Sequence, residues 1–376
     1  MKSALRMTFE GETESNVRMR KARYNMFNLH LGTTIHTLLA AAAVIALAAG
    51  GKLTASEFPQ TEISNGKLRA KLYLPDPKTG YYRGTRFDWS GVIASLEYEG
   101  HNYYGPWFDR IDPPVHDYIF KGTEVVAGAC SGISGPVEEF QTGDAALGWD
   151  EAKAGGTFIK IGVGALRKVG AKYDAYTLYE IVDPGKRTVK LHSDSVEFIQ
   201  ELTDPSSGYG YIYRKVVRLV DDKPEMVLEH GLKNTGRRTI HSTVYNHNFL
   251  VLDKQPPGPD FSISVPFQIH PTQSADERFA KAEENRIVFA KALENEDVVE
   301  IPFRGFGDTP KDYDIRIDNS KVGAGMRIQG DRPLSFVNFW SMRNVLAIEP
   351  FIAMTIDPGQ EFTWNVHYEY YTLSSH

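Results

Sequence analysis

The chain has 376 residues, of which 41% are hydrophobic and 24% charged, a globular composition that excludes disordered, collagen-like and polytopic membrane proteins. Its 42 basic and 48 acidic residues give a formal net charge of −6, which argues against a nucleic-acid-binding protein. The single cysteine, Cys130, excludes an internal disulfide framework and a cysteine-based zinc site.

The N-terminal segment has the order of a secretory signal peptide. A basic stretch between Arg18 and Arg23 precedes an alanine-rich apolar run at 38–49, which is short for a membrane span. The A-x-A pattern at 46–48 predicts cleavage after Ala48, with 53–55 as a weaker second site. We therefore expect residues 1–48 to be a signal peptide with an over-long start, Met19 being one candidate for the true start. The mature protein would be periplasmic or secreted, with no stable membrane association after cleavage. An uncleaved N-terminal anchor is the alternative.

Beyond residue 56 the sequence predicts short strands joined by tight turns. Aromatic residues reach 12%, and 33 Gly and 20 Pro residues favour strands and turns over a helical bundle. Alternating or β-rich segments lie at 157–166, 188–192, 211–220, 225–232, 239–252, 261–269 and 362–373. Turn signals separate them at 183–186, 221–224 and 234–236. The only helix-like stretch, at 275–291, is weak. One large antiparallel β-sandwich domain over residues 57–376 is the simplest interpretation.

The sequence lacks the common motifs for nucleotides, zinc proteases and serine hydrolases. There is no G-x-G-x-x-G on a strand–helix unit, no G-x-x-x-x-G-K-[ST], no H-E-x-x-H and no nucleophile elbow. Two polar residues in strand-like surroundings remain. His247 lies between two asparagines, and Glu349 lies between Ile348 and Pro350 in an apolar segment. A carboxylate is seldom kept in an apolar strand without a partner or a task.

The segment at 245–249 resembles the strand that carries the acid histidine in the aldose 1-epimerase (galactose mutarotase-like) superfamily, where the pattern is N-H-x-[YF]-F. The segment at 347–350 is similar to the family's L-E-P segment, which carries the base glutamate. The segment at 356–362 resembles its closing turn and last strand, and the segments at 200–202, 210–213 and 232–236 resemble its central strands. The likeness covers most of the chain after about residue 60, in the expected order.

The resemblance implies an all-β supersandwich with a sugar bound on one sheet face. It also implies interconversion of the α and β anomers of an aldose, with Glu349 as base and His247 as acid. No metal or cofactor is required for that reaction, and the expected partner is a sugar, either an aldose or an oligosaccharide. The two side chains should point into the same cleft. By analogy with paired carboxylates, we expect them to be separated by roughly 5–8 Å.

Further sugar-binding residues follow from the same resemblance. Arg86 is the nearest candidate for the arginine that holds sugar oxygens, although an ion pair with Asp88 at the sheet rim would explain it equally well. His116 or His101 is the candidate for a second histidine, and Asp314 for a sugar-binding aspartate. Four tryptophans could stack on a pyranose, of which one or two should touch the ligand: Trp89, Trp107, Trp149 and Trp340.

Two alternatives remain open at the level of the sequence. The family's G-R-x-x-N-R run is absent, which leaves room for a non-catalytic carbohydrate-binding protein on the same fold. A polysaccharide-processing accessory protein is the other alternative. The presence of both His247 and Glu349 favours the enzyme over the binding protein. The sequence gives no indication of the oligomeric state.

Overall fold

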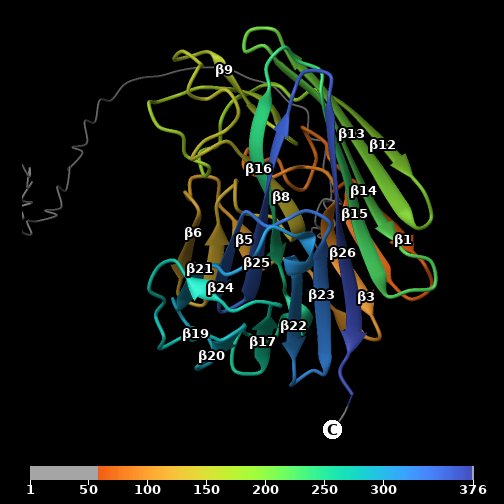
Figure 1. Ribbon diagram of the computed structural model, residues 1–376, viewed down its shortest axis with the longest axis vertical. Helices are drawn as coiled ribbons and strands as arrows, with labels where there is room; N and C mark the ends of the chain where they lie inside the picture. The colour runs from red at the N-terminus through yellow and green to blue at the C-terminus, as the bar shows by residue number, and fades with distance from the viewer. Residues whose placement is uncertain (1–57, 375–376) are drawn as a thin grey trace, which may run out of the picture. The chain divides into compact units, whose positions relative to one another are not determined.

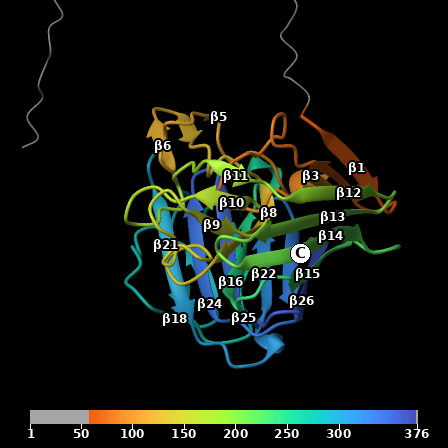
Figure 2. The same cartoon turned by 90° about the horizontal axis from the view of Figure 1, so that it is seen from above.

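The computed structural model describes residues 58–374, all of which lie within one compact unit, Ala55–His376 (Figures 1 and 2). The predicted signal peptide and its cleavage sites lie outside the described residues. Within residues 58–374 almost every regular element is a β-strand, and no helix is long and apolar enough to cross a membrane.

Two large antiparallel sheets dominate this part of the chain. The ten-stranded sheet has the order β12 (Lys186–Leu191), β13 (Ser195–Asp204), β14 (Tyr209–Leu219), β15 (Glu225–Asn234), β26 (Glu361–Thr372), β23 (Ala324–Gly330), β22 (Asp314–Asn319), β17 (Phe261–Ser264), β20 (Arg286–Phe289) and β19 (Ala280–Glu283). The six-stranded sheet has the order β18 (His270–Pro271), β21 (Val298–Arg304), β24 (Phe336–Met342), β25 (Val345–Ile356), β16 (Ile240–Phe249) and β8 (Gly135–Gln141).

Three smaller sheets complete the described strands. They comprise β1 (Gln60–Ser64), β2 (Arg69–Tyr73), β3 (Val92–Tyr98) and β4 (His101–Asn102); β11 (Ile181–Asp183), β10 (Gly164–Arg167) and β9 (Thr157–Lys160); and β5 (Arg110–Ile111), β7 (Glu124–Ala127) and β6 (Tyr118–Lys121). Two single-turn 3₁₀ helices, η1 (Leu252–Lys254) and η2 (Pro310–Asp312), lie in connections.

The main core lies between the two large sheets. Phe140 of β8 packs edge-on against Tyr213 of β14, with ring centroids 5.3 Å apart. Phe289 of β20 contacts Phe339 of β24 at 5.9 Å. These contacts pair one sheet with the other, so the architecture is a β-sandwich, as the sequence predicted.

Strand β16 presents alternate residues to two different environments. Asn248 faces the large sheet, where its side-chain oxygen accepts a hydrogen bond from the Tyr368 hydroxyl at 2.8 Å. Tyr245, His247 and Phe249 point to the opposite face, because successive strand residues alternate. On that face Phe249 belongs to a second apolar cluster that includes Trp107. The six-stranded sheet is therefore covered on both faces, which explains the nearly continuous burial of β16.

Most predicted strands are confirmed, and the 211–220 segment shows why. The alternating residues Tyr211, Tyr213, Lys215, Val217 and Leu219 of this segment are all buried in β14. The turn signals at 183–186, 221–224 and 234–236 coincide with the β11–β12, β14–β15 and β15–β16 connections. Alternation and turn residues are local features of the sequence, and the strands and turns that they predict are present in the folded structure.

Two segment predictions need correction. The stretch at 157–166 is not one strand but the hairpin of β9 and β10. It turns at Gly162, whose φ of 83° favours glycine, and a Cβ there would lie 2.7 Å from the Asp88 side chain. The helix-like stretch at 275–291 instead contains the hairpin of β19 and β20. The β-rich run at 286–289 buries Ile287 and Phe289 alternately, which a helix would not do.

Candidate active site

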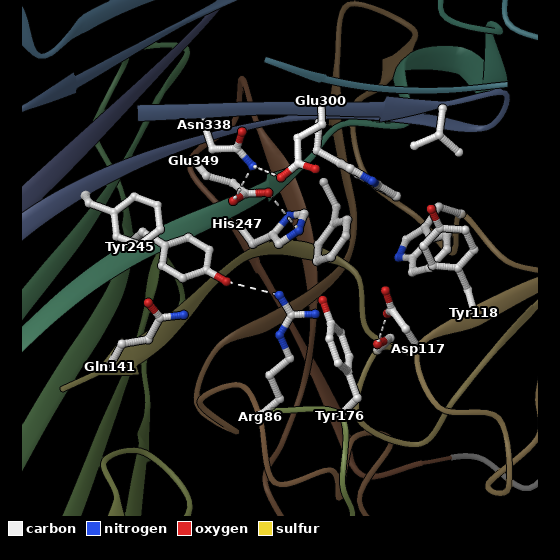
Figure 3. A pocket seen from close by; sticks show the side chains of 16 residues that line it. Arg86, Asp117, Tyr118, Gln141, Tyr176, Tyr245, His247, Glu300, Asn338 and Glu349 are labelled. Atoms are coloured by element: carbon white, nitrogen blue, oxygen red, sulfur yellow. Dashed lines mark hydrogen bonds and ion pairs between the residues drawn. The ribbon is translucent and has the colours of Figure 1, made fainter. Parts of the chain in front are cut away.

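A cavity of about 360 Å³ opens on the face of the six-stranded sheet that points away from the large sheet (Figure 3). This volume falls within the range of small-molecule sites. Its walls come from β6, β8, β16, β21, β24 and β25 and from connecting loops. The lining residues are Arg86, Trp107, Asp117, Tyr118, Ser131, Gln141, Tyr176, Tyr245, His247, Phe249, Val298, Glu300, Asn338, Trp340, Glu349 and Phe351.

His247 and Glu349 meet in this cavity. Strands β16 and β25 pair antiparallel with Tyr245 opposite Phe351, and Leu250 bridges to Leu346, so the same register places His247 opposite Glu349. Their side chains contact each other, with 3.1 Å between Nε2 and Oε1. The expectation of a shared cleft is met, but the expected gap of roughly 5–8 Å is not. Directly opposed residues on neighbouring strands have Cβ atoms only about 5 Å apart, so their side chains touch.

The Glu349 carboxyl group is held in its neutral form. Its side chain is 9% exposed. Burial raises its pKa to about 8, although the charge of Arg86 and a hydrogen bond from Asn338 act in the opposite direction. That hydrogen bond runs from Asn338 Nδ2 on the adjacent strand β24 to Oε2, at 3.3 Å. At neutral pH Glu349 therefore carries a proton.

His247 is neutral for a related reason. Its side chain is 6% exposed and stacks on Phe249, with ring centroids 3.7 Å apart. Burial lowers the pKa of His247 well below its usual value, and the nearby charge of Arg86 lowers it further. Among residues 58–374, the buried Nδ1 has no hydrogen-bond partner. At neutral pH the pair therefore carries one exchangeable proton beyond the N–H of the neutral imidazole. That proton resides on Glu349.

Arg86 reaches the same cavity from the loop between β2 and β3. Its Nε donates to Glu139 Oε2 at 2.7 Å, and its Nη2 donates to the Tyr245 hydroxyl at 3.1 Å. The guanidinium also lies over the Tyr176 ring, 4.8 Å from the centroid. The carboxylate that Arg86 binds is therefore Glu139. The alternative hypothesis from the sequence, an ion pair between Arg86 and Asp88, is wrong. Asp88 is buried elsewhere, with its Oδ2 3.9 Å from Lys215 Nζ.

Aromatic side chains form one end of the cavity. Trp107 and Trp340 line it and contact each other edge-on at 5.8 Å. Trp89 does not line it, because its indole is buried and donates to the Gly84 carbonyl at 2.8 Å. Trp149 is buried against Phe158. Two of the four tryptophans therefore lie where a ligand could touch them.

The other predicted sugar-binding residues are not brought into the cavity. His116 lies on the surface, with Nε2 2.8 Å from Asp174. His101 pairs with Asp253 at 2.6 Å on a different part of the fold. Asp314 begins β22 in the ten-stranded sheet, where Arg327 Nε donates to it at 2.7 Å. Each of the three side chains contacts a partner that does not line the cavity.

Several lining residues were missed by the sequence analysis. Asp117 follows His116 directly, and it is this neighbour that lines the cavity and accepts a hydrogen bond from Ser131. Tyr176 comes from the loop between β10 and β11, which carries no motif. Asn338 and Glu300 are brought in by the β21–β24–β25 register, and strand pairing of this kind has no local sequence signal.

The arrangement suits proton exchange with a hydroxylated ligand. One wall carries a one-proton pair, and Arg86, Asn338, Tyr245 and Gln141 offer hydrogen-bonding groups around it. Among residues 58–374, no group of three or more His, Cys, Asp or Glu side chains is arranged to hold a metal ion. The His247–Glu349 pair is suited to acid–base chemistry next to aromatic side chains.

Comparison with solved structures places the fold. This chain superposes on the Slr1438 protein from Synechocystis sp. PCC 6803 with a TM-score of 0.51 and 10% sequence identity. The superposition covers 85% of this chain and 98% of the Slr1438 chain. A galactose mutarotase related enzyme from Lactobacillus acidophilus gives a TM-score of 0.48 at 14% identity, covering 84% of this chain and 99% of that one. The aldose epimerase homologue from C. elegans gives 0.47 at 14% identity, with the same coverage.

No family profile and no curated protein matches the sequence. At these identities the structural likeness shows the fold alone. The superposition on the Slr1438 protein, at a TM-score of 0.51, supports the β-sandwich fold described above.

Proposed function

We propose that this protein is an aldose 1-epimerase that interconverts the α and β anomers of a sugar. The observation that carries the proposal is the His247–Glu349 pair, whose side chains contact each other at 3.1 Å on the wall of a cavity of sugar-binding size. A carbohydrate-related role also agrees with the mutarotase-like fold, although a fold by itself does not define an activity.

The reaction needs one group that takes a proton and one that gives a proton. The base removes the proton of the C1 hydroxyl, while the acid protonates the ring oxygen as the bond between C1 and that oxygen breaks. The open-chain aldehyde rotates about its C1–C2 bond and closes with the opposite configuration, and both proton transfers are reversed. A pair with a single proton supplies both functions at once.

We assign the role of base to Glu349 and the role of acid to His247, following the family resemblance. Because the resting proton resides on Glu349, this assignment requires the proton to pass to His247 before the C1 hydroxyl is deprotonated. The 3.1 Å contact between Nε2 and Oε1 is short enough for such a transfer. With the proton on His247, the carboxylate is free to act as base.

The remaining lining residues would orient the sugar. Trp340, which is half-buried, offers an apolar surface to the C–H groups of a pyranose ring. Arg86 and Asn338 offer N–H donors to its oxygens. Such positioning supplies a large share of the rate gain in reactions of this kind.

Polarimetry on freshly dissolved α-aldoses tests the proposal. We expect the optical rotation of at least one neutral sugar in a panel that includes glucose, galactose, xylose and arabinose to relax faster with the protein. The added rate should rise in proportion to protein concentration. If no sugar in the panel relaxes faster than its spontaneous rate, the protein is not an aldose 1-epimerase for these substrates.

The pH dependence of kcat/KM is a sharper expectation. Loss of the shared proton with a pKa of about 8 should lower activity above pH 8, because neither group can then act as acid. A second proton would go to His247, whose pKa lies well below 6.5, so activity should persist through pH 6.5 before it falls. Polarimetric rates from pH 5 to 10, corrected for the spontaneous reaction, provide the measurement. A rate that keeps rising above pH 9 would contradict a one-proton pair.

The direct His247–Glu349 contact also favours one alternative, a non-catalytic carbohydrate-binding protein. A pair closed at 3.1 Å leaves no room for C1 and the ring oxygen between the two groups. For catalysis, the two side chains must therefore move apart, or the sugar must bind with C1 and the ring oxygen against the side of the pair that faces the cavity. Binding of a sugar, seen as a change in tryptophan fluorescence, without any acceleration of mutarotation would favour this alternative.

A further inference from the structure

Strand β8 carries two adjacent buried carboxylates, Glu138 and Glu139, that face opposite ways. Glu138 points between the two large sheets, where it binds Lys215 and accepts a hydrogen bond from Asn246 Nδ2 at 2.9 Å. Glu139 points to the side of the cavity but does not line it. Both side chains are completely buried. Charges this deep are retained only with close partners.

Three hydrogen bonds hold the Glu139 carboxylate. Its Oε1 accepts from Lys160 Nζ at 2.9 Å. Its Oε2 accepts from Arg86 Nε at 2.7 Å and from the Tyr245 hydroxyl. Lys160 is also completely buried and donates to the Phe140 carbonyl at 2.8 Å. Its ammonium group is therefore fixed in place beside the Glu139 carboxylate.

The two groups that share Oε2 both line the cavity. Arg86 is a long side chain with many rotamers, and fixing it costs conformational entropy. Its guanidinium is held by Glu139 at Nε and by the Tyr245 hydroxyl at Nη2, while Tyr176 covers one face. Tyr245 in turn donates its hydroxyl hydrogen to Glu139. One carboxylate therefore sets the position of two cavity residues.

This support does not change with pH in the range where the pair works. Burial would raise the pKa of Glu139, but Lys160 and Arg86 outweigh it and lower the pKa to about 2. Glu139 thus stays ionised while the nearby Glu349 stays protonated at neutral pH. The difference lies in the partners: two cations contact Glu139, whereas Glu349 contacts a neutral imidazole and an amide.

We infer that Glu139 is a positioning residue, which holds the Arg86 guanidinium and the Tyr245 hydroxyl where they can bind sugar oxygens. The inference rests on the proposed aldose 1-epimerase function. Glu139 does not touch the substrate and acts only through Arg86 and Tyr245. Its removal should therefore affect substrate binding more than proton transfer.

Glu139→Gln tests this inference, because the amide places a donor against groups that are already donors. We expect kcat/KM to fall by about 10²-fold, the cost of roughly 1 Å of misplacement. Most of the loss should appear as a higher KM, since the His247–Glu349 pair is unchanged. In an Arg86→Met background, the same substitution should cost less than in the wild type, because one of the two side chains through which Glu139 acts is already gone.

Glu138→Gln is the matched control, with equal burial and an adjacent position on the same strand. It should lower the unfolding midpoint as Glu139→Gln does, but leave KM near the wild-type value. Equal KM changes in the two variants, or full additivity of Glu139→Gln and Arg86→Met, would reduce Glu139 to a structural charge and overturn the inference.

Two further measurements keep the test decisive. If Glu139→Gln does not fold, the double variant Glu139→Met/Lys160→Met removes both buried charges and should show the same KM effect. A crystal structure of whichever variant folds provides a readout without activity. Arg86 and Tyr245 should leave their wild-type positions, and unmoved side chains would contradict the inference even if the proposed enzymatic function failed.

Discussion

Glu349→Gln is expected to reduce anomerase activity by roughly 10²–10⁴-fold, the usual contribution of general acid–base catalysis. The amide has the shape of the protonated carboxyl group that burial already favours at this position. Its oxygen can accept from Asn338 Nδ2, and its NH₂ can donate to neutral His247 Nε2. It cannot exchange a proton, so sugar affinity should stay near the wild-type value while kcat falls. Polarimetric rates and tryptophan fluorescence titrations measure the two quantities.

His247→Asn provides the companion variant. It should also lower the rate, and the double variant should lose little more than either single one, because the two residues act as a unit. Unchanged rates in Glu349→Gln, with a wild-type activity clearly above the spontaneous reaction, would place the base elsewhere in the cavity.

Glu349→Gln is also expected to stabilise the fold at alkaline pH. The pKa of Glu349 is raised from about 4.5 to about 8 by burial, so the folded protein holds its proton where the unfolded chain has lost it. This favourable contribution is fully present below pH 4.5 and is lost as pH rises through 8, at about 1.4 kcal/mol per unit. The wild type therefore loses up to about 5 kcal/mol that Glu349→Gln retains.

Denaturant unfolding at pH 5, 7 and 9 measures this effect. The free energies of unfolding of the two proteins should be similar at pH 5, and the variant should be more stable by several kcal/mol at pH 9. A difference between wild type and Glu349→Gln that is constant with pH would mean that Glu349 is not buried as described.

Local signals in the sequence predicted most of the fold. The alternation in β14 identified a buried face that includes Lys215, and turn residues marked the ends of β11, β14 and β15. The failures came where a local pattern was ambiguous. Gly162 looked like an interior strand residue, but its positive φ makes the turn between β9 and β10. The 275–291 stretch has helix-forming alanines and charged residues. However, Ile287 and Phe289 are buried on one face of a strand, β20.

The candidate site was predictable only where a motif marked it. His247 and Glu349 stand in recognisable segments, and the structure brings both into one cavity with Arg86. Asp117, Asn338 and Tyr176 have no such motif, since loop closure and strand register place them there. Asp314 and His116 were chosen by position along the chain, but Asp314 lies in the ten-stranded sheet and His116 is exposed in the connection between β5 and β6.

The direct contact between His247 and Glu349 could not be predicted without the β16–β25 register. A shift of one residue would turn one of the two side chains to the other face of the sheet. Tyr245 opposite Phe351 fixes the register that makes them neighbours. The proton shared by the pair is therefore a consequence of strand pairing.

A crystal structure of Glu349→Gln with the aldose that wild-type protein converts fastest tests the central claim most directly. We predict that the C1 hydroxyl and the ring oxygen of the sugar lie within hydrogen-bonding distance, about 2.6–3.2 Å, of the side chains at positions 349 and 247. Arg86 and Trp340 should contact the same sugar ring. A sugar bound with another edge toward the pair, or outside this cavity, would contradict the proposal that His247 and Glu349 open the ring.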